Sequence, residues 1–495
     1  MPINSHATKE STKFARDIIW VGVSQIFTSL LGIVTMPALT KTYSTQNYGI
    51  WVQVSVTVGL VVPILTLQFM TTMVRFLAGE EDKEKRRRSL GAMLCAILIF
   101  SGFVFIAIYF LASQLSRFFF DSPTYINFVY LTFLWTFVDA LFTLFIANMR
   151  ARGEIKGLSI IQALFSVSKA GSIVTLVLLG LRLEWVIASM ISIEFIFVIA
   201  VIYFIVRDEG FPVLNFEGLG GFLSFSIPQI PIGILGWIMS ASDRYFITHF
   251  LNLSQTGIYS SSNYLAGLIA LFYSPIGYVL LPTVSKTWEQ KRKGDTKNYF
   301  EYSTRLFLTL AIPATVGLTM LSQSLLKILA TSEYLAGMEL VLLIGISQIF
   351  YGMFLINTYI VYLVKRTKWL LPIFITSSAI SIGLNAILIP SIGITGAAIS
   401  KIVAYFVLTV IVTIWIKKAM YYNIDIKYIA KVFIATLIMA ISIYFLKISG
   451  IKGIILSIII GVPVFGIALH LLKAFTEQDK RLIKQTFSGM IPQLH

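Results

Sequence analysis

Long apolar runs, separated by short polar breaks, recur along the whole 495-residue chain. A helix needs about 20 apolar residues to cross a hydrocarbon core of about 30 Å, and fourteen runs here reach that length. Hydrophobic residues make up 57% of the chain and charged residues 13%, whereas an ordinary soluble domain has about 45–50% and about 25%. The pattern predicts an all-helical, polytopic membrane protein and excludes a soluble enzyme.

The predicted spans form two halves of six and a final pair. The first half comprises residues 18–40, 48–72, 89–112, 125–147, 157–180 and 184–206. The second half comprises residues 222–248, 257–283, 304–326, 337–363, 370–390 and 396–416, and the final pair 430–449 and 453–472. The predicted organisation is therefore an N-terminal six-helix lobe at 1–206, a connector at 207–221, a C-terminal six-helix lobe at 222–416, and two additional helices with a tail at 417–495.

Basic residues are distributed unevenly between the two sides of this arrangement. With the N-terminus inside, the inner segments hold 30 of the 39 Lys and Arg residues and the outer segments hold six. Lys and Arg concentrate in cytoplasmic loops, so both termini are predicted to be cytoplasmic. Topology then explains the net charge of +16 without nucleic acid as a partner. The first run is too long for a signal peptide and is predicted to be a permanent helix.

The sequence contains no pattern that is typical of a cofactor or metal site. Cys95 is the single cysteine, and the four histidines are far apart, so neither an intramolecular disulfide nor a metal site is predicted. The glycines of the connector lack the lysine of a nucleotide-binding loop. No cofactor is therefore expected, and a coupling ion, H⁺ or Na⁺, is left open.

The two halves carry a weak internal repeat. Tyr48-Gly49-Ile50-Trp51 opens the second span, and Thr256-Gly257-Ile258-Tyr259 opens the eighth. A short polar turn precedes each motif, and each half has a basic loop between its fourth and fifth spans. Because six spans is an even number, the halves share one orientation, related by an axis along the membrane normal. Chance recurrence of Gly-aromatic pairs at membrane edges is the alternative.

Several further segments occur in a particular order. They are Arg75-Phe76-Leu77-Ala78, then Ser226-Ile227-Pro228 and Ser242-Asp243-Arg244-Tyr245-Phe246-Ile247, then Leu281-Pro282, and finally Asn385-Ala386-Ile387-Leu388-Ile389-Pro390 with Gly393-Ile394-Thr395-Gly396-Ala397-Ala398. With the 6 + 6 + 2 span count, this order resembles the polysaccharide (O-antigen-type) flippases of the multidrug/oligosaccharidyl-lipid/polysaccharide exporter superfamily.

That resemblance implies a V-shaped pair of six-helix lobes, in a pseudo-twofold parallel repeat, around a central cavity. It implies export of an undecaprenyl- or dolichyl-linked oligosaccharide by alternating access, for a surface glycan such as lipopolysaccharide. The implied location is the plasma membrane of a prokaryote. The implied partners are the lipid-linked oligosaccharide, membrane lipids and glycan-assembly proteins, with no nucleic acid.

Two other functions remain open. A cation-coupled multidrug antiporter of the same superfamily often has a carboxylate in the middle of its first helix, whereas Asp17 lies at the edge of that span here. A membrane glycan polymerase or ligase needs a sizeable outer loop, but the outer breaks in this chain are about a dozen residues or fewer. The sequence therefore favours a transporter over an enzyme.

Six charged residues lie inside predicted spans, where each costs about 2.5–3.5 kcal/mol without a partner or water. They are Asp139, Lys169, Glu194, Asp243, Arg244 and Lys401. All six are candidates for the substrate cavity, and Lys169 and Arg244 are the best candidates for binding the diphosphate of the carrier. The alternative for Lys169, near the bilayer midplane, is a buried ion pair with Glu194 or Asp139. Those two carboxylates are also candidates for ion coupling.

The other members of this set also have alternatives in which they have a structural role and do not bind substrate. Asp243 and Arg244 are about 100° apart on a helix, so we expect Arg244 to face the cavity and Asp243 a neighbouring helix; the alternative is a pair at the outer interface. Lys401 is close enough to the outer end of its span to reach the interface. Arg75, Pro228 and Pro231 are gate or hinge candidates, because the prolines should bend the seventh span.

Overall fold

The computed structural model describes residues 27, 31–32, 34–422, 425–446 and 450–474. Every regular element in these residues is a helix, which confirms the predicted all-helical fold class. Twelve described helices are long and apolar enough to cross a membrane, and the bent pair α10 (Leu253–Gly267) and α11 (Ala270–Glu289) counts as a thirteenth if it is one span. The first predicted span, 18–40, lies mostly outside the described residues, so fourteen is an approximate count. The chain is a multi-pass membrane protein.

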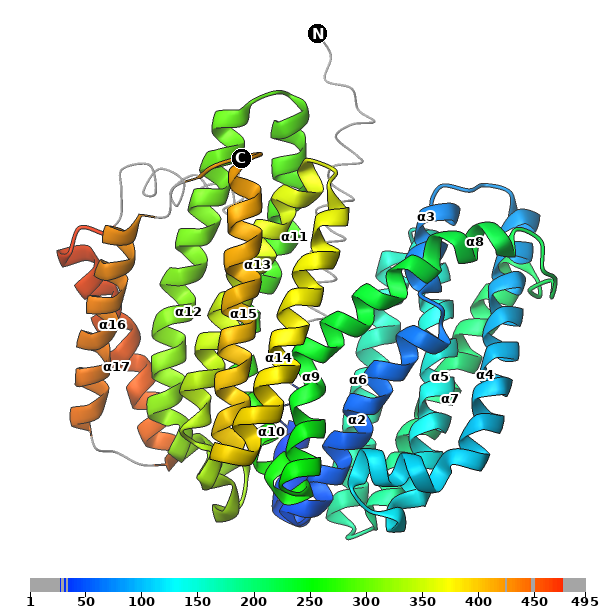
Figure 1. Cartoon of the computed structure of the whole chain (residues 1–495), viewed down its shortest axis with the longest axis horizontal. Coiled ribbons are helices and arrows are strands. Elements are labelled where there is room, and N and C mark those ends of the chain that lie inside the picture. The colour runs from blue at the N-terminus through cyan, green and yellow to red at the C-terminus, as the bar shows by residue number, and fades with distance from the viewer. Residues whose placement is uncertain (1–26, 28–30, 33, 423–424, 447–449, 475–495) are drawn as a thin grey trace, which may run out of the picture. The chain divides into compact units, whose positions relative to one another are not determined.

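The chain forms two compact units, Met1–Ser260 with Ser381–Ala397, and Ser261–Ile380 with Ala398–His495. The first unit contains α2 (Thr45–Leu65), α3 (Phe69–Leu77), α4 (Lys83–Phe120), α5 (Ile126–Ala151), α6 (Ile155–Leu178), α7 (Leu183–Glu209), α8 (Leu219–Ser226), α9 (Ile230–Phe250) and the start of α10 (Figure 1). The second contains α11, α12 (Lys293–Leu329), α13 (Leu340–Leu363), α16 (Ile426–Leu446) and α17 (Gly450–Leu471). Two more helices, α14 (Leu370–Ile392) and α15 (Ile394–Lys417), are divided between the units. The predicted four-part division of the chain stays a prediction.

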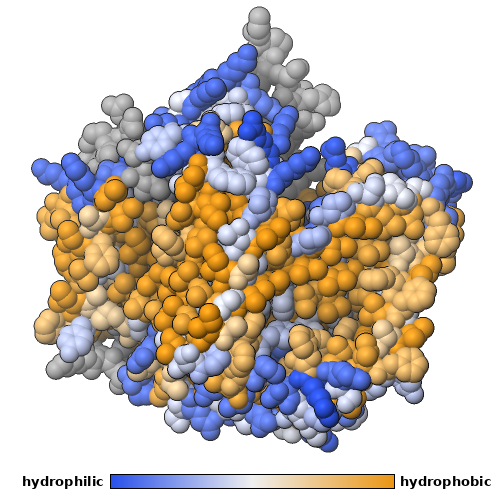
Figure 2. All heavy atoms as spheres, viewed as in Figure 1, coloured by the Kyte–Doolittle hydropathy of each residue, from blue (hydrophilic) through white to orange (hydrophobic). Residues whose placement is uncertain are grey.

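Each unit is organised around one well-contacted helix. In the first unit α5 packs against α2, α3, α4 and α7, and in the second α12 packs against α11, α13, α16 and α17. By contrast, α4 exposes large apolar side chains along its length, among them Phe103, Tyr109 and Phe110. Figure 2 shows apolar residues over the middle of the helices and hydrophilic residues at their ends. An apolar exposed surface bounded in this way is what contact with lipid requires.

Besides the bend between α10 and α11 within the predicted span 257–283, two other predicted spans are interrupted. The predicted span 48–72 ends as α2 at Leu65, because Leu67 and Gln68 adopt left-handed backbone angles (φ of 48° and 56°) before α3 begins. The predicted span 222–248 passes through the 3₁₀ turn η2 (Ile227–Gln229) between α8 and α9. Pro228 lies in this turn and Pro231 in the first turn of α9, where the missing proline N–H is tolerated.

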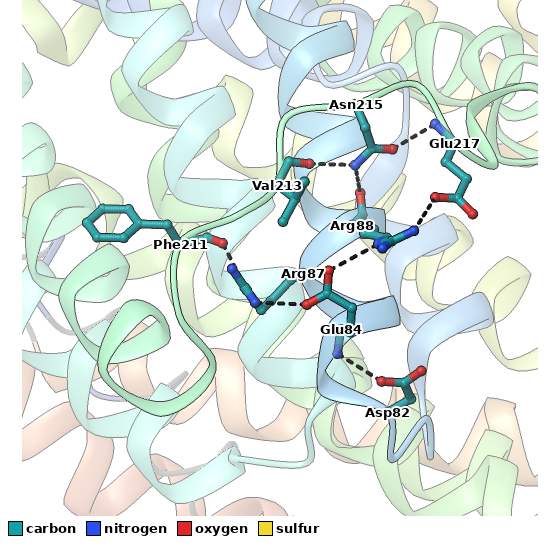
Figure 3. A network of polar contacts seen from close by, with 8 residues as sticks. All are labelled: Asp82, Glu84, Arg87, Arg88, Phe211, Val213, Asn215 and Glu217. Atoms are coloured by element: carbon teal, nitrogen blue, oxygen red, sulfur yellow. Dashed lines mark hydrogen bonds and ion pairs between the residues drawn. The ribbon is translucent and has the colours of Figure 1, made fainter.

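The predicted connector, residues 207–221, is bonded to the start of α4 rather than being a free link. The Arg87 Nε donates to the Phe211 carbonyl at 3.0 Å, and the Arg88 guanidinium pairs with Glu217 at 3.1 Å. The Asn215 side-chain amide donates to the Arg88 carbonyl at 3.0 Å (Figure 3). A Cβ atom on Gly91 would lie 1.9 Å from the Val213 carbonyl oxygen, so the connector approaches α4 closely enough to require glycine there.

Candidate functional site

The Lys169 ammonium group lies among groups from three helices of the first unit. Its Nζ is 3.7 Å from Glu194 Oε2 of α7, and that carboxylate is 1% exposed. The Trp135 indole N–H of α5 donates to the same oxygen at 2.9 Å. The Asp139 carboxyl interacts with that of Glu194. The structure therefore brings together the three charged candidates of the first six spans.

Aromatic rings complete the surroundings of Lys169. Its Nζ lies 4.6 Å from the centroid of the Trp135 ring and 5.1 Å from that of Phe165. Both distances are within the range of a cation–π interaction. The Trp135 side chain thus has a polar role as a hydrogen-bond donor. Its spacing from Asp139, four residues along one helix face, is the local signal for it.

Asp243 and Arg244 of α9 form a buried pair with each other. The Arg244 Nη1 donates to Asp243 Oδ1 at 2.9 Å and to the Ser240 carbonyl at 2.6 Å. Asp243 faces a neighbouring helix as expected, since its Oδ2 accepts a hydrogen bond from Tyr259 of α10, whereas the Arg244 side chain folds back onto Asp243 and Ser240. That Arg244 faces the cavity stays a prediction. The outer-interface alternative fails, since Asp243 is 3% exposed and Arg244 is 7% exposed.

Tyr259, a fully buried residue of α10, holds this pair in place. Its hydroxyl donates to Asp243 Oδ2 at 2.5 Å, and the Arg244 guanidinium carbon lies 5.7 Å from the centre of its ring. Tyr259 closes the motif that resembles Tyr48-Gly49-Ile50-Trp51, but nothing in that motif specifies a carboxylate partner. Its role was therefore missed from the sequence.

In the second unit, Lys401 of α15 is 3% exposed, so it does not reach the membrane interface. Its Nζ donates to Asn263 Oδ1 of α10 at 3.1 Å. A neutral amide is a weaker partner for an ammonium group than a carboxylate. Asn263 is a second partner that sequence reasoning missed, because asparagine inside an apolar run is an uncharged and inconspicuous signal.

The gate and hinge candidates lie on neighbouring elements of the first unit. Arg75 is an exposed residue in the last turn of α3. The Thr71 hydroxyl of α3 donates to Gln229 Oε1 of η2 at 2.9 Å, beside Pro228. The Phe76 ring packs edge-on against Phe222 of α8, with ring centroids 5.3 Å apart. The interruptions of the second and seventh spans are therefore side by side.

An apolar cavity of about 450 Å³ lies in the second unit. Its wall comes from α12, α16, α17 and the bend between α10 and α11, and its only polar lining residues are Thr309 and Ser457. Small residues such as Gly317 and Gly461 leave the space open. A cavity of this chemistry suits a hydrocarbon chain and offers little to a charged group.

In the described part of the chain, no group of three or more His, Cys, Asp or Glu residues is arranged to hold a metal ion. The groups that are present can instead bind charge and hydrogen-bonding atoms inside an apolar bundle. Among the described residues, the buried Arg244 and Lys401 and the partly exposed Lys169 each have an internal partner. Substrate binding at Lys169, Arg244 or Lys401 would therefore require an exchange of partners.

Comparison with known proteins finds similarity to proteins of polysaccharide and glycan biosynthesis. The model of the family described as polysaccharide biosynthesis protein matches residues 14–288. A probable low-salt glycan biosynthesis flippase, Agl15 of Haloferax volcanii, is 23% identical over 197 residues. That match covers 40% of this chain and 42% of the length of the relative.

Solved structures with the same fold cover most of the chain. A lipid II flippase, MurJ, in an inward closed conformation, matches 92% of this chain and 98% of its own with a TM-score of 0.76 at 14% identity. An inward-facing multidrug resistance transporter of the MATE family matches 80% of this chain and 94% of its own with a TM-score of 0.65 at 12% identity. At these identities the likeness concerns the fold.

Proposed function

This chain belongs to the polysaccharide biosynthesis protein family, and on that basis we propose that it moves a lipid-linked oligosaccharide across a membrane. The carrier presents a polar sugar diphosphate on a long hydrocarbon tail. A transporter for such a molecule needs hydrogen-bonding and cationic groups inside the bundle, and an apolar surface for the tail. The observation that carries the proposal is that the family match, over residues 14–288, includes the charged groups around Lys169 and Arg244 inside the helix bundle. The apolar cavity is lined mostly by residues that follow the matched segment.

The polar part of the substrate has candidate partners in Arg244 and Lys169. A desolvated diphosphate is best held by charge-assisted hydrogen bonds, and arginine offers a planar fork of donors. Arg244 already has a buried acidic partner at 2.9 Å, so phosphate binding would replace or extend that pair. The apolar cavity of about 450 Å³ in the second unit is suited to part of the hydrocarbon tail. Alternating access is the mechanism proposed with this substrate.

We place the protein in the plasma membrane of a prokaryote with both termini in the cytoplasm. The support is the concentration of 30 of the 39 basic residues in segments of one side, following the positive-inside rule. After Cys95 is replaced by alanine, single cysteines can report each side, because Gln290 and Thr124 are both exposed. In intact cells an impermeant thiol reagent should label cysteine at 124 and spare cysteine at 290. Labelling at 290 in sealed cells would reverse this orientation.

A drug antiporter is the second candidate, because the same fold occurs in a MATE multidrug transporter. The two candidates differ in substrate, and neither requires bond-making chemistry, so the protein is proposed to be a transporter and not an enzyme. Purified protein in proteoliposomes can separate them. We expect an impermeant glycosidase to reach lipid-linked oligosaccharide from the inner leaflet only when the protein is present. Transport of ethidium with no movement of glycolipid would support the antiporter instead.

A further inference from the structure

The surroundings of Lys169 have the composition of a site for an organic cation. Ring faces of Trp135 and Phe165 lie 4.6 Å and 5.1 Å from its ammonium nitrogen. Aromatic faces combined with carboxylates are the groups that proteins use to recognise alkylammonium ligands. Here Glu194 supplies a carboxylate at 3.7 Å.

The parts of this site are held by contacts that do not involve Lys169. The Trp135 indole N–H bonds Glu194 at 2.9 Å, which fixes the carboxylate and the ring relative to each other. The Phe165 ring packs against Phe142 and Phe197, with centroids 4.8 Å and 5.5 Å away. Trp135 is 6% exposed and Glu194 is 1% exposed, so both belong to the packed interior of the first unit.

We propose that Trp135, Phe165 and Glu194 form a binding site for a primary ammonium group, and that the chain occupies this site with its own Lys169. Lys169 acts as a tethered ligand from α6, with its ammonium group against Trp135 of α5 and Glu194 of α7. An external cation can enter only when the lysine is absent. The inference does not depend on which substrate the protein transports.

The first test is chemical rescue in purified, full-length protein. Lys169→Ala removes three carbons and the ammonium nitrogen, which n-propylammonium restores. We expect the variant to melt at a lower temperature than the wild type, and n-propylammonium chloride to raise its melting temperature by several degrees above NaCl of equal ionic strength. The wild type should not distinguish the two salts, because its site is full.

The matched control removes the acidic partner as well. Lys169→Ala/Glu194→Gln should not respond to n-propylammonium, although losing both charges should restore part of the stability. A simple ion pair without a binding site predicts that restored stability but no amine response in the single variant. An absent amine response in folded Lys169→Ala, or an equal response in the double variant, would overturn the proposal.

A second measurement needs no variant of Lys169 and applies if Lys169→Ala does not fold. Acetic anhydride acylates free amines, and peptide mass spectrometry reports the rate at each lysine. Acylation of Lys169 should be several-fold faster in Glu194→Gln and Trp135→Phe proteins than in the wild type, while that of exposed Lys85 should be unchanged. Equal rates at Lys169 in all three proteins would contradict an occupied site.

Discussion

Gly49 and Gly257 lie against each other where the first turns of α2 and α10 cross. A Cβ atom on Gly49 would be 1.9 Å from the Leu253 carbonyl oxygen, and one on Gly257 would be 2.4 Å from the Thr45 carbonyl oxygen. Each carbonyl belongs to the residue four positions before the opposing glycine. The contact is therefore reciprocal, as a pseudo-twofold relation between the two repeat motifs predicts.

Replacement of either glycine by alanine should separate the two helices. Overpacking of this kind costs typically 1–3 kcal/mol, and here the opposing atoms are backbone, which cannot rotate away. We expect Gly49→Ala and Gly257→Ala to lower the yield of monodisperse protein in detergent and its melting temperature. Gly102→Ala is the matched control, because that glycine has no atom within 4 Å of the added Cβ. Normal stability of Gly49→Ala would contradict the close crossing.

A similar substitution tests the attachment of the connector to α4. Gly91→Ala would place a methyl group against the Val213 carbonyl, which a Cβ would approach to 1.9 Å. We expect proteolysis within residues 207–217 to become at least several-fold faster, since the connector must lift away from α4. Gly102→Ala on the same helix should leave the cleavage rate unchanged. An unaltered digestion pattern in Gly91→Ala would show that the connector does not need this contact.

Modest insertion is a separate test of the connector. The bonds to α4 end at Glu217, so Gly-Ser residues inserted between Glu217 and Gly218 should preserve folding, because lengthening a loop costs little closure entropy. The same insertion between Pro212 and Val213 should lower the yield of folded protein. Equal tolerance at both points would count against a bonded connector.

The Asp243–Arg244 pair gives opposite expectations for single and double variants. Asp243→Asn leaves a buried guanidinium without its charged partner, which typically costs 3–5 kcal/mol. Asp243→Asn/Arg244→Gln removes both charges and should recover most of the melting temperature.

For transport, Arg244→Lys should be a poor replacement, because lysine lacks the planar fork, whereas Lys169→Arg should keep part of the activity that Lys169→Gln loses. Full transport by stable Arg244→Gln protein would exclude an anchoring role for this residue.

Tyr422, between α15 and α16, is a buried phenol whose stabilising role has a defined pH range. Its hydroxyl donates to Asn357 Oδ1 and lies 3.3 Å from the Thr304 hydroxyl. Burial raises the pKa of Tyr422 to about 12, so this contribution is fully present below pH 10 and is lost as pH rises through 12. Tyr422→Phe should cost about 1–3 kcal/mol, with the same difference from wild type at pH 6 and pH 9. The control is Tyr421→Phe, since Tyr421 is exposed.

The apolar runs alone predict most of the helices, because a lipid-exposed helix must be apolar over about 20 residues whatever it packs against. The break at Leu67 and Gln68 is different, since neither residue type favours a left-handed backbone. The polar partners also escape local patterns. Tyr259 meets Asp243 from another helix, and Asn263 meets Lys401 across 138 positions of sequence. Such pairs depend on tertiary packing, and only the Trp135–Asp139 spacing gave a local hint.

The proposed transport brings a lipid-linked oligosaccharide to the outer face of the membrane. Right-side-out spheroplasts allow this to be measured, because periodate added outside oxidises only sugars on the outer leaflet, and mass spectrometry of extracted lipid gives the oxidised fraction. On depletion of the protein, we predict that this fraction falls severalfold while the total lipid-linked pool rises, and that wild-type protein restores both but stable Arg244→Gln protein does not. An oxidised fraction that stays constant on depletion would contradict the account.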